Sequence, residues 1–178
     1  NTLATKGGLW CDMDIVFRKS LNEMFQDNKQ DPDTILCYDH RLREHDGAPE
    51  KPIGFLLSAP NNIFFKKAIL ESKKTYNPSH YQSIGTVILK RLGNTISDCK
   101  RIYWKNQFLN LDPGKIYHFH HQLVGEIFNE EAEIPPGVVG IHWYGGHPIS
   151  QEFNKKVEHT NYLLFNNTMS KILKEVLS

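Results

Sequence analysis

The stretch Lys6-Gly7-Gly8-Leu9-Trp10-Cys11-Asp12-Met13-Asp14-Ile15-Val16 decides the fold, because an apolar run is followed at once by two carboxylates. Leu9-Trp10-Cys11 predicts a strand. Alternate residues of an extended chain face the same way, so Asp12 and Asp14 offer two carboxylates to one point. Oxygen ligands suit Mg²⁺ or Mn²⁺, which keep open positions for phosphate oxygens. The alternative is a solvated acidic turn that favours the N-terminus of a following helix.

Outward from this stretch, strand and helix patterns alternate along the chain. The predicted strands are Thr34 to Tyr38, Ile53 to Ser58, Ile102 to Trp104, Lys115 to Phe119 and Val138 to Tyr144, with a polar surface loop over 39–52. The predicted helices begin at Ser20, at Asn61 or Asn62 with Ile63, Phe64, Ala68 and Ile69 on one side, and near Ile84 with Val87, Ile88 and Leu92 buried before a stop at Gly93. A last helix carries Leu163, Leu164, Met169, Ile172, Leu173 and Val176. This order favours one α/β or α+β three-layer domain over 1–178, and the fold expected is α/β with a mixed central sheet.

Composition limits the partners that the chain is expected to have. Of its 178 residues, 39% are hydrophobic and 23% are charged, which is typical of a compact globular domain. Its 21 Lys and Arg nearly balance 20 Asp and Glu, so no basic footprint points to nucleic acid or to anionic lipid. No apolar run reaches the roughly 20 residues of a membrane span. The three cysteines, Cys11, Cys37 and Cys99, are widely spaced and predict free thiols.

The stretch from Lys6 to Val16 resembles the Gly-Gly, aromatic, Asp-x-Asp signature of nucleotide-sugar glycosyltransferases with a GT-A fold. The segments 53–55, 58–61 and 83–86 are similar to the sugar-binding region of the alpha-mannosyltransferase-like and clostridial-toxin-like members. Gly140-Ile141-His142-Trp143-Tyr144-Gly145-Gly146 looks like the closing block of such enzymes. The resemblance covers roughly residues 5 to 147, and the Asp-x-Asp block is its most specific part.

The resemblance implies a GT-A-like three-layer sandwich and a metal-dependent transfer of a sugar from a UDP- or GDP-linked donor to a hydroxyl of a glycan, lipid or protein acceptor. It implies Mn²⁺ or Mg²⁺ as cofactor, and retention rather than inversion of the anomeric configuration. Only 11 residues precede Asp12, whereas the family holds the nucleobase with elements before its Asp-x-Asp triplet. The chain is therefore expected to be the C-terminal portion of a catalytic domain with roughly 60 to 100 further residues upstream. A cytoplasmic location is favoured, and a Golgi location would require an anchor in that missing part.

The resemblance also implies roles for individual residues. Asp12 would face the donor ribose and sugar hydroxyls, Asp14 would bind the metal directly, and His142 would be the third ligand. Backbone N–H groups of Gly145 and Gly146 would stabilise charge on the departing diphosphate. The remaining donor-binding candidates are Gly8, Asn61, Ser83, Gly85 and Trp143. The structural alternatives are a buried core histidine for His142, ordinary helix starts for Asn61 and for Ser83 with Gly85, and a core tryptophan for Trp143.

Two competing functions remain open at this level. One is a catalytically inactive nucleotide-sugar- or glycan-binding domain of the same fold. The other is a metal hydrolase built on His118 and His120, which share a face in a strand. The sequence contains no Gly-x-Ser-x-Gly elbow, P-loop or Gly-x-Gly-x-x-Gly fingerprint. Two close carboxylates repel each other, so Asp14→Asn is expected to change stability little without metal.

Overall fold

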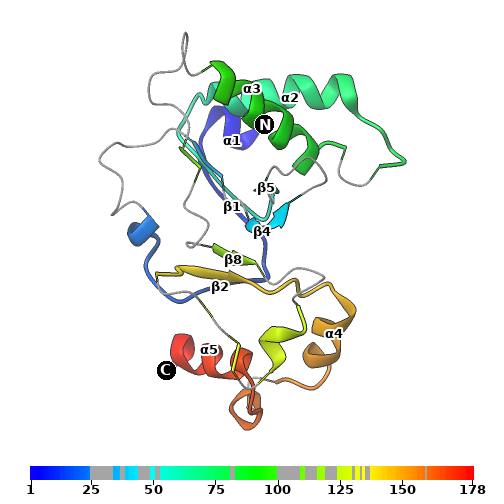
Figure 1. The fold of residues 1–178 in the computed structure, drawn as a ribbon. Helices are drawn as coiled ribbons and strands as arrows, with labels where there is room; N and C mark the ends of the chain where they lie inside the picture. Colours follow the sequence, from blue (N-terminus) through cyan, green and yellow to red (C-terminus); the bar gives the residue numbers. More distant parts are fainter. Residues whose placement is uncertain are drawn as a thin grey trace. The chain divides into compact units, whose positions relative to one another are not determined.

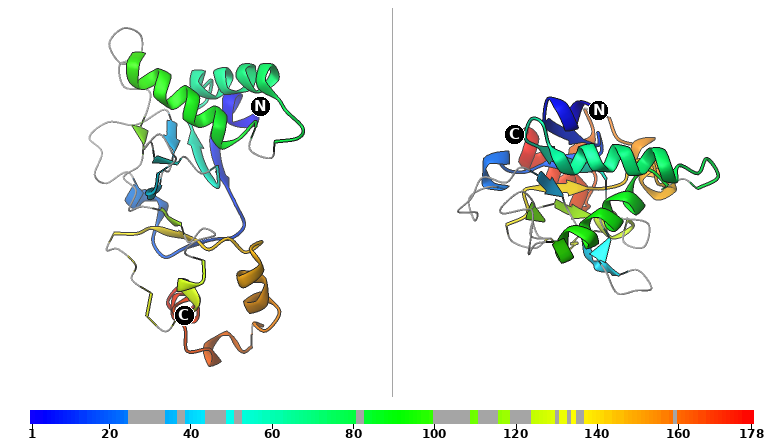
Figure 2. Two further views of the ribbon diagram at one scale, coloured as in Figure 1. Left: turned by 45° about the vertical axis from the view of Figure 1, so that its right-hand side comes forward. Right: turned by 90° about the horizontal axis from the view of Figure 1, so that it is seen from above.

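The computed structural model describes residues 1–24, 34–36, 39–43, 49–50, 53–80, 83–99, 109–110, 116–118, 124–129, 131–132, 134, 137–158 and 160–178. The chain forms two compact units, Asn1–Cys11 with Asn28–Pro113 and Asp12–Asp27 with Gly114–Ser178. Both units contain helices and strands, which confirms the mixed α/β class (Figures 1 and 2). In the described part of the chain, no helix has the length and apolarity that a membrane crossing needs.

The first unit is built on a four-stranded mixed sheet. Its strands, in spatial order, are β1 (Gly8–Cys11), β6 (Phe55–Ser58), β3 (Thr34–Leu36) and β7 (Leu109–Asn110). β6 is antiparallel to both neighbours, and β3 and β7 are parallel. The prediction of a loop over 39–52 was wrong, because β4 (Asp39–Arg43) and β5 (Pro49–Glu50) pair there in a two-stranded antiparallel sheet. A polar sequence lacks the apolar alternation that marks a half-buried strand.

In the part of the first unit that the structure describes, three helices accompany the sheet: α1 (Thr2–Thr5), α2 (Ile63–Thr75) and α3 (Thr86–Cys99). Of the two predicted caps, Asn62 is the one used, because its side-chain oxygen accepts a hydrogen bond from the Phe65 N–H at 3.1 Å. Its Nδ2 also donates to Thr34 Oγ1 at 2.6 Å, with both residues buried. One asparagine thus starts α2 and attaches it to β3.

The core of the first unit lies between these helices. It contains Ala4, Phe64, Phe65, Ala68, Ile88, Leu89 and Leu92, with Leu56 of β6 packed against them. Phe64, Ala68, Ile88 and Leu92 are buried as predicted. Ile63 and Val87 are exposed, contrary to the prediction, and Phe65 and Leu89 are buried in addition. α3 also continues through Gly93, because a single helix-interior glycine costs only about 1 kcal/mol relative to alanine.

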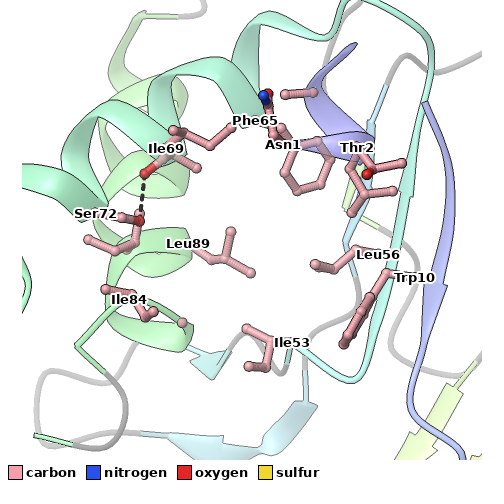
Figure 3. A pocket seen from close by; sticks show the side chains of 15 residues that line it. Asn1, Thr2, Trp10, Ile53, Leu56, Phe65, Ile69, Ser72, Ile84 and Leu89 are labelled. Carbon is pink, nitrogen blue, oxygen red and sulfur yellow. Dashed lines mark hydrogen bonds between the residues drawn. The ribbon is translucent and has the colours of Figure 1, made fainter. Parts of the chain in front are cut away.

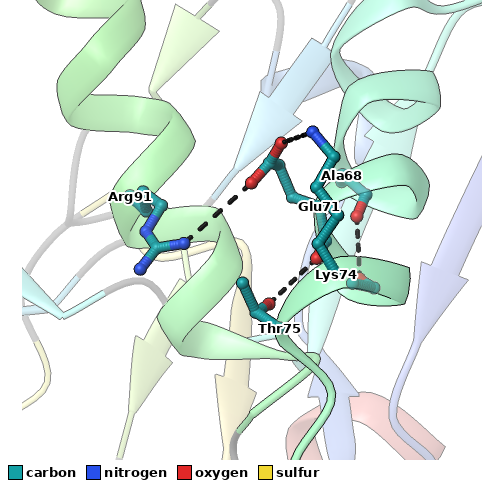
Figure 4. Close-up of polar contacts among 6 residues, drawn as sticks. Ala68, Glu71, Lys74, Thr75 and Arg91 are labelled. Atoms are coloured by element: carbon teal, nitrogen blue, oxygen red, sulfur yellow. Dashed lines mark hydrogen bonds and ion pairs between the residues drawn. The ribbon is translucent and has the colours of Figure 1, made fainter.

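An ion-pair cluster at the surface connects α2 and α3 (Figure 4). Lys74 Nζ donates to Glu71 Oε1 at 2.8 Å within α2, and Arg91 of α3 lies 3.9 Å from Glu71 Oε2. These contacts hold the pKa of Glu71 below its usual value, with the Lys74 hydrogen bond as the largest cause. Exposed pairs of this kind contribute little to stability, so the apolar core dominates the packing of the two helices.

The second unit contains a three-stranded mixed sheet. Its central strand β9 (Gly140–His142) is antiparallel to β2 (Ile15–Phe17) and parallel to β8 (Ile116–His118). The predicted helix at Ser20 is a single 3-10 turn, η1 (Leu21–Met24), in which the Ser20 hydroxyl accepts from the Asn22 N–H. The predicted strand Ile102 to Trp104 and residues Cys37 and His120 lie outside the described residues, whereas Cys11 carries a thiol, as expected.

The described residues after β8 in the second unit form the helices η2 (Glu126–Phe128), α4 (Pro148–Asn154), η3 (Tyr162–Leu164) and α5 (Thr168–Leu177). The core contains Ile127, Val138, Ile141, Phe153, Met169 and Ile172. α5 begins only after Asn167, whose side chain accepts from the Ser170 N–H at 2.8 Å. Leu163 and Leu164 therefore lie outside this helix and are exposed, contrary to the prediction.

Candidate metal centre

A tight turn brings Asp12 and Asp14 together. The Ile15 N–H donates to the Asp12 carbonyl at 3.3 Å, which closes a turn over the Asp-x-Asp triplet. The two carboxylates therefore converge through a turn, whereas the sequence pattern predicted that they converge through an extended backbone. Met13, between them, points out to solvent. The turn leads directly into β2, so the position of β2 sets the position of both carboxylates.

The pairing of β2 with β9 brings His142 to this turn. Ile15 and His142 are partners in the antiparallel register, so Asp14 lies beside the end of β9. His142 Nε2 lies 3.1 Å from Asp14 Oδ1 and 3.8 Å from Asp12 Oδ2. One potential ligand atom from each residue lies within 4.8 Å of the others. The three residues predicted from the sequence as metal ligands thus share one place within the second unit.

Burial differs sharply between the three side chains. His142 is only 4% exposed, whereas the carboxylates of Asp12 and Asp14 are 37% and 26% exposed. The histidine is buried on a strand, as its structural alternative required, and it also faces both carboxylates. The three residues therefore combine one buried imidazole with two partly solvated carboxylates.

Asp14 is held by more than its histidine neighbour. The Gly145 N–H donates to Asp14 Oδ2 at 2.8 Å, and the Trp143 N–H donates to the Asp14 carbonyl at 3.2 Å. The side-chain hydrogen bond with His142 is the largest cause that holds the pKa of Asp14 below its usual value, and the Gly145 N–H adds to it against the opposing effect of burial. Asp14 is thus kept ionised, which is the form that binds a cation.

The two glycines after Tyr144 differ in the space around them. A Cβ added to Gly145 would lie 3.3 Å from the Asp14 Cβ and 3.5 Å from the Trp143 ring, whereas one added to Gly146 would meet nothing within 4 Å. A side chain at Gly145 would therefore crowd Asp14, and the Gly145 N–H is directed at that carboxylate. Trp143 packs its side chain against the core of the second unit.

Tyr144 belongs to the site and was missed in the sequence analysis. Its ring stacks on the His142 imidazole, with centroids 4.0 Å apart and an interplanar angle of 14°. Its φ is 50°, in the left-handed region that side-chain-bearing residues rarely adopt. Its place two residues after a candidate ligand is a sequence signal that could have pointed to it, since such residues share a face in extended chain.

The other predicted donor-binding residues, Gly8, Asn61, Ser83 and Gly85, belong to the first unit. Gly8 has a φ of 109°, and the Asn61 N–H donates to the Thr5 carbonyl at 3.1 Å. The buried Ser83 hydroxyl donates to the Asn77 carbonyl at 3.0 Å, and the Gly85 carbonyl accepts from the first turn of α3. Each thus has a local structural role within its own unit.

The first unit also contains an apolar cavity of about 590 Å³ (Figure 3). Trp10, Leu56, Phe65, Ile69, Ile84 and Leu89 are among the side chains around it. The Ser72 hydroxyl, at the same wall, donates to the Ala68 carbonyl at 2.7 Å. This cavity is lined only by residues of the first unit, and all three candidate metal ligands belong to the second.

Comparison of the chain with known protein families, with curated proteins and with solved structures gives no match. The geometry of the described residues therefore carries the functional argument. His118 lies in β8 in parallel register with His142, while His120 and His121 lie outside the described residues.

The donor set suits a divalent cation that accepts both oxygen and nitrogen. Mg²⁺ favours oxygen ligands, whereas imidazole is a common ligand of transition metals. Two ligands that are each about 2.1 Å from a cation and at right angles to each other lie about 3 Å apart. The 3.1 Å between His142 Nε2 and Asp14 Oδ1 is close to this spacing. The atoms that now share a hydrogen bond could therefore share a cation after a small adjustment.

Proposed function

We propose that Asp12, Asp14 and His142 bind a divalent cation, Mn²⁺ in preference to Mg²⁺, and that this site serves the transfer of a sugar. The observation that carries the proposal is the convergence of the three ligand atoms within 4.8 Å. Two carboxylates give the charge that a divalent cation needs, and the buried imidazole supplies a fixed third ligand. The preference for Mn²⁺ follows from the nitrogen donor.

The reaction proposed is transfer from a nucleoside diphosphate sugar to a hydroxyl of a glycan, lipid or protein acceptor, with retention favoured over inversion. The sequence resemblance to GT-A glycosyltransferases supports this choice of substrate and a GT-A-like three-layer fold. Departure of the nucleoside diphosphate builds negative charge on the β-phosphate, which a bound cation stabilises. The chain's own part is to hold two carboxylates and one imidazole oriented before substrate arrives.

A catalytically inactive nucleotide-sugar-binding domain is the second candidate. It would use the same three ligands, so the triad itself supports both candidates equally. Binding of metal and nucleotide without turnover would distinguish it from the enzyme.

Isothermal titration of the 178-residue protein with MnCl₂, MgCl₂ and ZnCl₂ tests the metal site. The expected result is one Mn²⁺ per chain, tighter than Mg²⁺, with binding lost in Asp14→Asn and weakened in His142→Ala. Lys155→Ala is the control, because Lys155 is an exposed side chain of the same unit that pairs with Glu152. If the wild-type protein binds none of these cations, the three residues form only a structural hydrogen-bonded group.

Titration with UDP and GDP in saturating Mn²⁺ then tests the substrate class. Metal-dependent binding of one of them, lost in Asp14→Asn, would support the glycosyltransferase proposal, and sugar release from UDP-glucose or GDP-mannose would distinguish the enzyme from the inactive domain. Mn²⁺ binding without any nucleotide binding would contradict the sugar-transfer proposal and leave the metal site standing. In that case His118→Ala tests the hydrolase alternative, which predicts loss of metal-dependent ester hydrolysis.

A further inference from the structure

We infer that Tyr144 is a positioning residue that orients His142 and Asp14 together for cation binding. This inference rests on the proposed metal site and adds a residue that is not itself a ligand. Tyr144 combines an unfavourable backbone conformation with a stacked ring at the site. Strain of this kind persists where the surrounding structure imposes it, and it is concentrated at functional sites.

The backbone of Tyr144 directs its two neighbours at Asp14. The Trp143 N–H donates to the Asp14 carbonyl, and the Gly145 N–H donates to its side-chain Oδ2. Tyr144 lies between these two donors with a φ of 50°. In an extended strand, the N–H groups of residues i and i+2 point the same way but lie about 7 Å apart along the strand. A left-handed residue between them bends the chain and so allows both to reach one residue. The backbone thus fixes both the main chain and the carboxylate of Asp14.

The ring of Tyr144 acts on the other ligand. It lies nearly parallel to the imidazole of His142 at a centroid distance of 4.0 Å. A flat ring against the imidazole face opposes rotation about the Cβ–Cγ bond of His142, and so keeps Nε2 directed at the carboxylates. Groups that orient a metal ligand from outside the coordination shell typically change metal affinity by about 10- to 100-fold.

A glycine would satisfy the backbone at position 144 without strain, so the conformation alone does not explain a tyrosine there. The stacking explains why a tyrosine is present, because its ring covers the imidazole face, which glycine or asparagine would leave uncovered. The two properties therefore make separable predictions. Residues that tolerate the left-handed region but lack a ring should keep the turn and lose the orientation of His142.

The test compares Tyr144→Asn, Tyr144→Gly and Tyr144→Phe by Mn²⁺ titration and by thermal unfolding in EDTA. Tyr162→Asn is the matched control, since Tyr162 is a tyrosine of η3 in the same unit. We expect Mn²⁺ binding about tenfold or more weaker in the Asn and Gly variants, with melting temperatures in EDTA not lowered. The Phe variant should restore wild-type affinity, because it keeps the ring.

Wild-type affinity in Tyr144→Asn or Tyr144→Gly would overturn the inference. So would a Phe variant as weak as the Asn variant, because the hydroxyl and not the stacking would then be responsible. If one ringless variant fails to fold, the other still decides the question. A wild-type protein that binds no Mn²⁺ would overturn the metal site itself, and this inference with it. Failure of the metal site is thus seen in the wild type, whereas failure of this inference alone is seen only in the Tyr144 variants.

Discussion

His142 Nε2 and Asp14 Oδ1 lie 3.1 Å apart, although the two residues are remote from each other in the sequence. The antiparallel register of Ile15 with His142 produces this contact. It gives the carboxylate a partner on one oxygen, while the Gly145 N–H holds the other. The consequences for stability and binding can be measured separately.

In EDTA, Asp14→Asn should lower the free energy of unfolding by about 1–2 kcal/mol, since a hydrogen bond to a charged group is lost and an amide cannot accept on both sides. This differs from the expectation from the triplet alone, in which repulsion between Asp12 and Asp14 dominates. Asp12→Asn is the matched comparison and should cost less, because its carboxylate lies 3.8 Å from His142 and is more exposed. Urea unfolding measures both, and an Asp14 variant as stable as wild type would contradict the geometry.

The stability difference between wild type and Asp14→Asn should depend on pH. The folded-state pKa of Asp14 is lowered, mainly by the hydrogen bond with His142, so its contribution is fully present above the unfolded-state pKa of about 3.9. It should be lost as the pH falls through the folded-state pKa. Urea unfolding in EDTA between about pH 3 and pH 6 should therefore show the two proteins converging at the acid end. A difference that grows on acidification would have the wrong sign.

Gly145→Ala and Gly146→Ala should differ although the substitutions are identical. A Cβ at Gly145 would crowd Asp14 and Trp143, whereas one at Gly146 has open space. We expect Gly145→Ala to weaken Mn²⁺ binding by about tenfold, through displacement of Asp14, and Gly146→Ala to leave it unchanged. Titration of both variants checks this, and equal effects would mean that the close approach at Gly145 is absent in solution.

Ser72→Leu should stabilise the first unit, because it places an apolar side chain at the wall of the 590 Å³ cavity and removes a hydroxyl that bonds back to α2. The expected gain is about 1 kcal/mol in the free energy of unfolding. Lys73→Leu is the control, since it adds the same side chain at an exposed position of α2. Equal stabilities of the two variants would show that the cavity is filled or closed in solution.

Local patterns in the sequence were enough to predict several elements. The strand before Asp12, the asparagine cap of α2 and the amphipathic helices α2 and α3 depend on neighbours within a few residues, so short-range spacing reveals them. The same spacing wrongly placed Ile63 and Val87 on the buried faces, because the side chains that a helix buries depend on the element that packs against it. β4 and β5 were missed because their sequences are polar and lack the apolar alternation by which a strand is predicted. Only their pairing with each other, seen in the structure, identifies them as strands.

The carboxylates of Asp12 and Asp14 are a property of the sequence, and their proximity follows from a turn of four residues. The resemblance implied His142 as a third ligand, but its contact with Asp14 and the close approach of Gly145 to that carboxylate were decided by tertiary structure. Both depend on the pairing of β2 with β9, which joins segments that are remote in the chain. Local spacing does not identify the partner strand, because backbone hydrogen bonds can form between any two strands, and the register of remote strands is fixed when their apolar faces pack together.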